Sequence, residues 1–212
     1  METATIARLL QPFAELSTLQ LQSISIYVDI LLRWNARINL TGLRTPQDIV
    51  VRHFGESFFA ASKMITPDWK GRIVDLGSGA GFPGLPMALW APNTEVILIE
   101  SSGKKGAFLN EVIRALRISN AQVFKERAEA YDSTAELVTM RAVEKFERAL
   151  LEASRLIEDG GRLGLMVGAD QVKVARRILS EFGWQEPIST PSGHSRELLI
   201  GTKQIKVEYR KP

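Results

Sequence analysis

The sequence predicts an α/β fold of the Rossmann-like type, with helices on both faces of a doubly wound, mostly parallel sheet. Two observations carry this prediction. Short apolar segments alternate with helical patterns from residue 71 to the C-terminus, as in sheets whose strands are joined by right-handed crossovers. Residues 72–84, RIVDLGSGAGFPG, combine a buried strand, a glycine turn and a helix start. In such sheets this unit brings backbone close to a ligand.

The composition limits the classes of protein that the chain can represent. Its 212 residues, 45% of them hydrophobic, suffice for one α/β core and a small appendage. We expect no membrane span and no signal peptide, because no apolar run of the required length is present. Cysteine is absent and only His53 and His194 are histidines, which argues against disulfides and against a metal site. These features favour a cytoplasmic protein.

The overall charge is only mildly basic. The net charge is +3, and the basic residues of the segment 202–212 concentrate positive charge at the end of the chain. A basic end is weak evidence for an anionic partner such as nucleic acid. A solvated terminus explains the same residues equally well.

Residues 1–70 read as helices that cap the sheet rather than as an independent domain. Apolar residues at three- and four-residue steps predict a helix over 18–34, with Thr18 as a candidate N-cap. We expect a shorter helix near residues 6–10 and another that begins near Pro46. The core domain then spans residues 71–212.

The segment that joins these helices, residues 35–45, is rich in polar side chains. Helix capping is the favoured role for Asn35 and Thr41. A structural role is likewise favoured for His53, which has apolar neighbours on its predicted helix. The alternative is that one wall of a site is formed by Asn39, Arg44, Arg52 and His53.

The core is expected to alternate strands with helices. Strands are predicted at 73–76, 94–100, 121–125, 136–141 and 161–167. Two more are predicted at 184–190 and 197–202, with an antiparallel direction as the expectation, and residues 206–209 stay unassigned. Helices are predicted at 83–89, with Pro83 in the first turn, and at 108–116, 144–157 and 171–182.

The candidate ligand residues fall at the C-terminal ends of these strands, where open α/β sheets bind their ligands. Each has a structural alternative, such as an ion pair for Arg141, but their shared edge favours a site. They are Asp75 with Gly77, Gly79 and Gly81, then Glu100, Ala128, Glu129 and Arg141.

The spacing of these residues limits which ligands the site can bind. Glu100 lies nineteen residues after Gly81, where an acid can accept both hydroxyls of a ribose. Both NAD and S-adenosyl-L-methionine carry such a ribose. The loop reads G-x-G-x-G, and Phe82 stands where the dinucleotide fingerprint needs Gly or Ala. The loop therefore favours S-adenosyl-L-methionine, which has no pyrophosphate to bind.

Three stretches together resemble the RsmG family, also called glucose-inhibited division protein B. They are WNARINLTG at 34–42 with Arg52-His53 and Glu56-Ser57, then DLGSGAGFPGLP at 75–86, then ESSGKK at 100–105 with the pieces at 127–129 and 140–142. The match runs from about residue 20 to 170. The family usually has Asp where this chain has Glu56, preceded by a residue larger than Gly55, and no family signature follows residue 185.

This resemblance implies a fold, an activity and a partner. The fold is that of class I S-adenosylmethionine-dependent methyltransferases. The activity is methyl transfer to N7 of a specific guanine in 16S ribosomal RNA, in the small subunit or its precursor, and we expect a monomer. The implied cofactor contacts are Gly77, Phe82, Ala128, Glu129 and Arg141, with Glu100 near the adenosine. Phe82 and Ala128 rest on the resemblance alone.

The chemistry implied for N7 needs no general base, because this atom carries a free lone pair. The sequence accordingly offers no Ser/His or Cys/His pair, and we assign no catalytic acid or base. The candidates for positioning are Arg141, Lys104, Asn39 and His53. Lys104 and Lys105 are also candidate phosphate contacts, although a solvated basic helix start is equally consistent with them.

Three other readings stay open. A methyltransferase acting on another substrate shares every cofactor feature. An NAD-dependent oxidoreductase shares the fold and Glu100, but it predicts a G-x-G-x-x-G loop and a catalytic Tyr/Lys or His. A non-catalytic RNA-binding module could retain the fold.

Overall fold

The computed structural model describes residues 1–193 and 196–205, and its centre is one eight-stranded sheet. The strand order is β3-β2-β1-β4-β5-β8-β6, and β7 pairs with β8. The strands are β1 (Arg72–Leu76), β2 (Glu95–Ile99), β3 (Ala121–Phe124), β4 (Ala135–Arg141), β5 (Ile157–Gly168), β6 (Phe182–Trp184), β7 (Ile188–Ser189) and β8 (Arg196–Lys203).

The pairing directions confirm the predicted mostly parallel, doubly wound sheet. Strands β1 to β5 pair in parallel. Strand β8 runs antiparallel to β5, and β6 and β7 run antiparallel to β8. The antiparallel direction expected for the end of the chain is therefore correct. Because β1 lies between β2 and β4, its carboxyl end sits where the strand order reverses, which is the ligand-binding position of such sheets.

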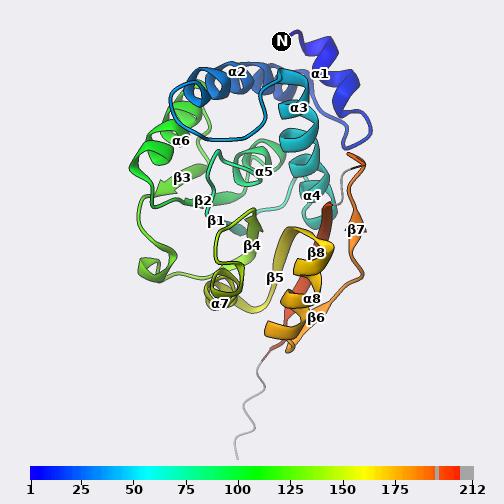
Figure 1. The fold of residues 1–212 in the computed structure, drawn as a ribbon, viewed down its shortest axis with the longest axis vertical. Helices are drawn as coiled ribbons and strands as arrows, with labels where there is room; N and C mark the ends of the chain where they lie inside the picture. The colour runs from blue at the N-terminus through cyan, green and yellow to red at the C-terminus, as the bar shows by residue number, and fades with distance from the viewer. Residues whose placement is uncertain (194–195, 206–212) are drawn as a thin grey trace, which may run out of the picture.

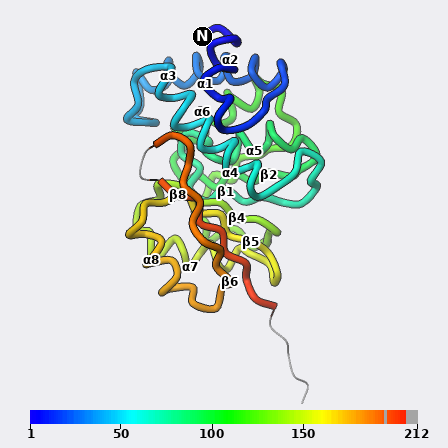
Figure 2. The backbone as a smooth tube through the Cα atoms, turned by 90° about the vertical axis from the view of Figure 1, so that its right-hand side faces the viewer, coloured from blue at the N-terminus to red at the C-terminus, as the bar shows by residue number. Residues whose placement is uncertain are grey.

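Helices cover both faces of this sheet (Figures 1 and 2). The N-terminal helices lie above it with α5 and α6, and α7 and α8 lie below. The upper group is α1 (Thr3–Leu10), α2 (Thr18–Asn35), α3 (Pro46–Ile49), the π-helix η1 (Val50–Gly55), α4 (Glu56–Met64), α5 (Gly84–Trp90) and α6 (Gly103–Ala115). The lower helices are α7 (Phe146–Leu156) and α8 (Ala169–Ile178), and a 3-10 turn, η2 (Ala128–Ala130), follows β3.

Side-chain alternation along the strands divides the hydrophobic core into two clusters. Ile73 of β1 and Leu137 of β4 belong to the cluster beneath the N-terminal helices. Their neighbours Val74 and Val138 belong to the cluster above α7 and α8. Since side chains of a strand alternate in direction, Arg141 lies on the same face as Leu137. The alternation thus directs Arg141 toward the N-terminal helices.

Several predicted boundaries were wrong. The N-cap of α2 is Ser17, whose hydroxyl accepts from the Gln20 amide, rather than Thr18. Pro83 caps α5 from outside instead of lying in its first turn. Helix α8 ends at Ile178 rather than at Phe182, because the backbone of Leu179 leaves the helical region, with φ −110° and ψ 57°, and Phe182 already begins β6.

The strand predicted over 184–190 is two short strands, β6 and β7, separated at Pro187, which has no amide to donate to a ladder. His194 and the unassigned residues 206–209 lie outside the described residues. Within 1–193 and 196–205, no helix is long and apolar enough to cross a membrane.

Lys203, the first basic residue of the charged C-terminal segment, has a structural partner. Its ammonium group donates to the carbonyls of Ser154 and Ile157, at 3.2 and 2.6 Å. Lys203 therefore anchors β8 to the end of α7 rather than offering its charge to an anionic partner. The remaining basic residues of that segment lie beyond residue 205, outside the described part of the chain.

Candidate active site

The glycine loop after β1 turns sharply and is tied to the neighbouring strand. The amides of Gly77 and Ser78 both donate to the Ile99 carbonyl at the end of β2, at 3.0 Å. Gly77 has a φ of +70° and Gly81 a φ of +82°, values that residues with a side chain rarely adopt. A Cβ at Gly81 would also collide with the Tyr27 hydroxyl. Gly77, by contrast, is exposed at the open side of the loop.

Glu100 is held against this loop by backbone amides. One carboxylate oxygen accepts from the Gly79 amide at 2.9 Å, and the other accepts from the Ser102 amide at 2.8 Å. The residue is only 7% exposed. Each carboxylate oxygen has a second lone pair, so the group can accept two further hydrogen bonds in this fixed orientation. The two amides thus fix the orientation of the carboxylate at the end of β2, and its predicted contact with ribose hydroxyls stays a prediction.

A cavity of about 320 Å³ opens at these strand ends, and we call it the first cavity. Its wall includes Gly77, Glu100, Ala128 and Glu129, which come from three separate loops. Glu129 forms an ion pair with Arg148 of α7 at 2.6 Å. The structure therefore brings together four of the residues that the sequence predicted as cofactor contacts.

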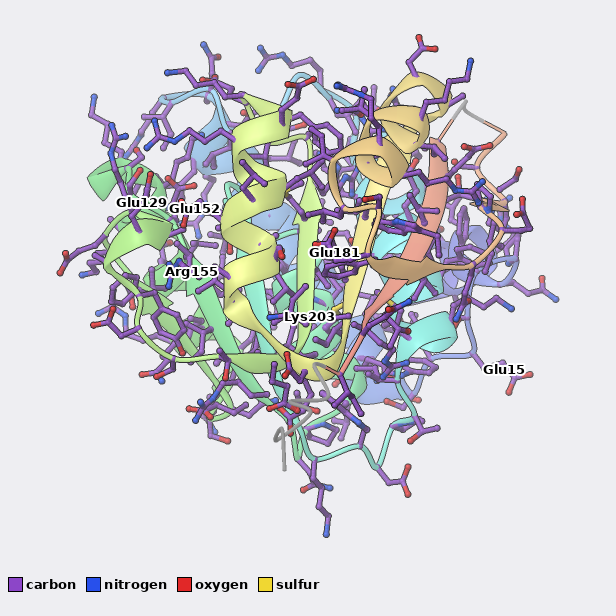
Figure 3. All side chains as sticks on the ribbon, turned by 90° about the horizontal axis from the view of Figure 1, so that it is seen from below. Glu15, Glu129, Glu152, Arg155, Glu181 and Lys203 are labelled. Atoms are coloured by element: carbon purple, nitrogen blue, oxygen red, sulfur yellow. The ribbon has the colours of Figure 1, made fainter. Side chains whose placement is uncertain are left out.

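Arg155 of α7 holds the loop that carries Ala128 and Glu129. Its guanidinium donates to the carbonyls of Ala128 and Tyr131, at 2.6 and 2.9 Å. Figure 3 shows Glu129, Glu152 and Arg155 gathered beside this helix. Arg155 thus shapes the cavity by a hydrogen bond to Ala128, which lies 27 positions earlier in the chain. The sequence pattern does not reveal this contact.

Asp75 lies beneath the loop and does not border the first cavity. Its carboxylate accepts from the Thr139 hydroxyl at 2.9 Å and from the Gly84 amide at 3.1 Å. Asp75 therefore joins β1 to β4 and to the start of α5. Burial raises the pKa of the Asp75 carboxyl to about 6, despite these hydrogen bonds.

This raised pKa predicts an unusual pH dependence of stability. Asp75 ionises less readily in the folded chain than in the unfolded one, so its charge costs stability above pH 6, by roughly 3 kcal/mol. The cost disappears as the pH falls from 6 toward 4. As the pH falls from 6 to 4, the unfolding free energy of the wild type should therefore rise relative to that of Asp75→Asn. Urea unfolding of both proteins between pH 4 and 8 measures the difference, and a constant difference would contradict the prediction.

Arg141 is the centre of a second group of polar residues, on the other side of the glycine loop. It is 7% exposed, and one of its terminal nitrogens lies 3.0 Å from the carboxylate of Glu56, which is fully buried. The same nitrogen donates to the Arg52 carbonyl at 2.7 Å. Burial lowers the pKa of Arg141 to about 10, which leaves it charged at neutral pH. The glutamate also pairs with Arg196 of β8, at 3.4 Å.

His53 completes this group as a neutral side chain. Its Nδ1 lies 3.0 Å from an Arg141 nitrogen, and its Nε2 lies 2.7 Å from the Thr41 hydroxyl. Arginine has only donors, so Nδ1 must accept and Nε2 carries the proton. Burial and the nearby Arg141 lower the pKa of His53 well below its usual range. With both nitrogens engaged, His53 holds its neighbours in position and is not available as a base.

Phe82 connects the loop to this group. Its ring stacks on His53, with centroids 4.7 Å apart, and on Tyr27 at 5.4 Å. The side chain is therefore buried among aromatic rings of the N-terminal helices and does not border the first cavity. Gly81 has the same surroundings, because it lies against Tyr27.

Comparison with known proteins places the chain in a family. The model of the family described as rRNA small subunit methyltransferase G matches residues 20–182. A relative named ribosomal RNA small subunit methyltransferase G, from Xylella fastidiosa, is 41% identical over 157 residues, which cover 73% of this chain and 72% of the relative. The chain belongs to this family. A protein of the same name from Chloroflexus aggregans is 35% identical over 88% of this chain and 83% of its own length.

Solved structures confirm the fold of this methyltransferase G family member. A ribosomal protein L11 methylase from Lactobacillus delbrueckii superposes with a TM-score of 0.63 at 11% identity, over 73% of this chain and 79% of that one. A SAM-dependent O-methyltransferase from Thermotoga maritima gives 0.60 at 16% identity, over 72% and 66%. The class I methyltransferase fold predicted from the sequence is correct.

Other predicted residues of the family member lie away from the first cavity. Asn39 is exposed in the loop after α2, and Lys104 is exposed in the first turn of α6, with Lys105 half-buried beside it. Asn35 is structural, but it does not cap a helix as was favoured for it. Its side chain accepts from the Leu40 and Thr41 amides and donates to the Thr41 carbonyl, which fixes the loop after α2. The roles predicted for Asn39 and Lys104 stay predictions.

Proposed function

We propose that this member of the methyltransferase G family transfers the methyl group of S-adenosyl-L-methionine to N7 of a guanine in 16S ribosomal RNA. The observation that carries the proposal is the orientation of Glu100 in the first cavity, with both oxygens fixed and capacity left for two hydroxyl donors. The names of its relatives in the family, which state ribosomal RNA small subunit methylation, support the substrate.

The residues around the first cavity suit the adenosine part of the cofactor. Glu100 would accept the ribose hydroxyls, and Gly77 would allow the close backbone approach that the cavity wall requires. Ala128 and Glu129 would contact the adenine, on a loop that Arg155 holds. Gly79 fixes Glu100, while Gly81 and Phe82 hold the loop against the N-terminal helices. Arg141 lies on the other side of the glycine loop and would position neighbouring groups from there.

The cofactor, when bound, supplies a sulfonium methyl group that is open to direct displacement. Guanine N7 brings its own lone pair, and it carries no proton that must be removed. The protein therefore has to position the two reactants rather than to exchange protons, and positioning alone reaches effective molarities of about 10⁵–10⁸ M. The neutral, fully engaged His53 agrees with this role. Arg141, whose charge would oppose the positive charge that develops on the guanine, holds neighbouring groups instead.

We further propose the setting in which this reaction takes place. The substrate RNA would be presented in the small ribosomal subunit or its precursor, and the protein would act as a monomer in the cytoplasm. The N-terminal helices, residues 1–70, would form a cap beside the cofactor domain, residues 71–212. Sedimentation of the free protein and of its mixture with small subunits tests the monomer and the partner.

The direct test is methylation of small subunits, or of their RNA, prepared from a strain that lacks this modification. Labelled S-adenosyl-L-methionine should give N7-methylguanosine in the 16S RNA. Cofactor binding without any methylated RNA would refute the substrate. NAD is titrated in parallel, because tight NAD binding without S-adenosyl-L-methionine binding would favour an oxidoreductase.

A matched pair of glycine variants tests the cofactor site. Gly77→Val should abolish binding of S-adenosyl-L-methionine, because its side chain would enter the cavity wall beside Val143, where even a Cβ comes within 3.2 Å. Gly160→Val is the control, since Gly160 in β5 also has a positive φ, +80°, but does not border the cavity. Calorimetry measures the affinity of both. Unchanged binding by Gly77→Val would contradict the site.

A further inference from the structure

A second cavity, of about 360 Å³, opens beside Arg141. Its wall consists of residues 41–43 together with Arg52, His53, Arg141 and Arg196. These residues come from the N-terminal loop, the π-helix, the end of β4 and the start of β8. The first cavity is formed by different residues, on the other side of the glycine loop. The second cavity is therefore a separate recess that faces the N-terminal helices.

The electrostatics of this recess favour an anion. Glu56 is the carboxylate that pairs with two of its three arginines, Arg141 and Arg196. Arg52 forms no ion pair within residues 1–193 and 196–205. His53 adds no further positive charge at neutral pH, because burial and the nearby arginines lower its pKa well below its usual range. Three guanidinium groups and one carboxylate thus give this cluster a net charge of +2, and Arg52 is the arginine that has no paired acid among the described residues.

Two nitrogen atoms of these arginines are also unsatisfied. Nη1 of Arg141 and Nε of Arg52 are buried and have no hydrogen-bond partner in the described part of the chain. A buried donor without an acceptor costs free energy, and the cost is larger for a charged group. Both residues border the second cavity, so a ligand there is the available source of acceptors. The missing partner is an acceptor that carries negative charge.

We propose that the second cavity binds a phosphate of the substrate RNA, with Arg52, Arg141 and Arg196 as its ligands; this inference rests on the proposed function. The planar guanidinium fork matches the oxygens of a phosphate. Arg196 is 31% exposed, which leaves the recess accessible to a polymer from solvent. A phosphodiester presents only acceptors, and the arginines present only donors.

The cofactor also carries an anion, the carboxylate at its methionine end, but that end fits the recess less well. An ammonium group lies next to that carboxylate and needs an acceptor of its own. The carboxylate of Glu56 already accepts from Ser192, Arg141 and Arg196. The three arginines would repel the ammonium group. The excess of donors therefore favours the RNA phosphate over the cofactor.

The test measures RNA affinity as a function of salt. Arg52→Gln should weaken binding of a 16S RNA transcript roughly tenfold at low salt and reduce the slope of log K against log salt by about one. Arg196→Gln should do the same. Arg177→Gln is the control, because it removes an equal charge from α8, where Arg177 is 69% exposed and pairs with Glu147. That variant should keep the wild-type slope.

The same proteins separate the competing outcomes. S-adenosylhomocysteine affinity should stay within twofold of wild type in both cavity variants, and Arg52→Lys should keep the slope but lose part of the affinity. An unchanged slope in the two glutamine variants, with wild-type methylation intact, would overturn the phosphate site alone. Loss of S-adenosylhomocysteine affinity with unchanged RNA binding would overturn it in favour of the cofactor carboxylate. If the wild type fails to methylate RNA but the slopes fall as expected, the phosphate site stands and the proposed reaction fails.

Discussion

Replacing Glu56 with alanine is expected to lower the free energy of unfolding by about 3–5 kcal/mol. The carboxylate is fully buried, and it lies 3.0 Å from Arg141, which is itself 7% exposed. Without Glu56 the Arg141 charge would stay buried with no acid to balance it. Removing one partner of a buried pair is costly for this reason, even where the intact pair contributes little. Urea unfolding at neutral pH measures the loss.

Glu186→Ala is the matched control for this prediction. Glu186 also pairs with an arginine, Arg176, but it is 90% exposed, so its loss should cost less than about 1 kcal/mol. Glu56→Gln should fall between the two alanine variants, since its amide oxygen can still accept from Arg141. A loss for Glu56→Ala as small as that of the control would show that Arg141 does not depend on this carboxylate.

Replacing Glu100 with alanine is expected to weaken S-adenosyl-L-methionine binding by about 10²–10⁴-fold. Hydrogen bonds to a charged group contribute roughly 1.5–3 kcal/mol each, and we propose that this carboxylate accepts two from the ribose. The variant also removes the acceptor of the Gly79 amide, so the loop loses an anchor. Calorimetric titration with S-adenosylhomocysteine measures the affinity without turnover.

Two controls separate the ribose contacts from general electrostatics. Glu126→Ala removes another acidic side chain from the wall of the same cavity and should change the affinity far less. A cofactor analogue that lacks both ribose hydroxyls should lose much less affinity in Glu100→Ala than S-adenosylhomocysteine does, because only the effect of the loosened loop remains. If Glu100→Ala still weakens binding of that analogue by the full factor, the carboxylate acts through the loop and not through the ribose.

The sheet and the first cavity could be predicted because both depend on local patterns. Apolar strand segments place their polar ends at one edge, so Gly77, Glu100 and Glu129 meet whatever the details of the helices between them. The strand ends at β6 and β7 were predicted less well. The bounds of β6 and β7 are set by the residues that pair with β8, with a break at Pro187. The alternation of apolar and polar residues does not show which residues form those backbone hydrogen bonds.

The surroundings of Arg141 could not be predicted from such patterns. Its acid, Glu56, lies on a different element 85 residues away, and the sequence shows only a polar residue inside an apolar helix. Phe82 was chosen by resemblance as a cofactor contact, yet its ring packs against His53 and Tyr27. Which side of the loop a side chain occupies is decided by the packing of the N-terminal helices, and a single sequence does not give that packing.

The π-helix at Val50–Gly55 has a consequence for how this chain can vary. A π-turn holds one residue more than an α-turn, and it leaves the Arg52 carbonyl to accept from Arg141, at 2.7 Å. Because the extra residue is absorbed within this one wide turn, the helix on either side keeps nearly the phase of an uninterrupted α-helix. Loss of one residue here would leave a regular α-helix, in which the Arg52 carbonyl is directed along the helix axis to the amide four residues on. The wide turn is thus what presents a main-chain acceptor to a buried arginine, and a deletion here is expected to cost Arg141 that hydrogen bond while leaving the helix itself intact.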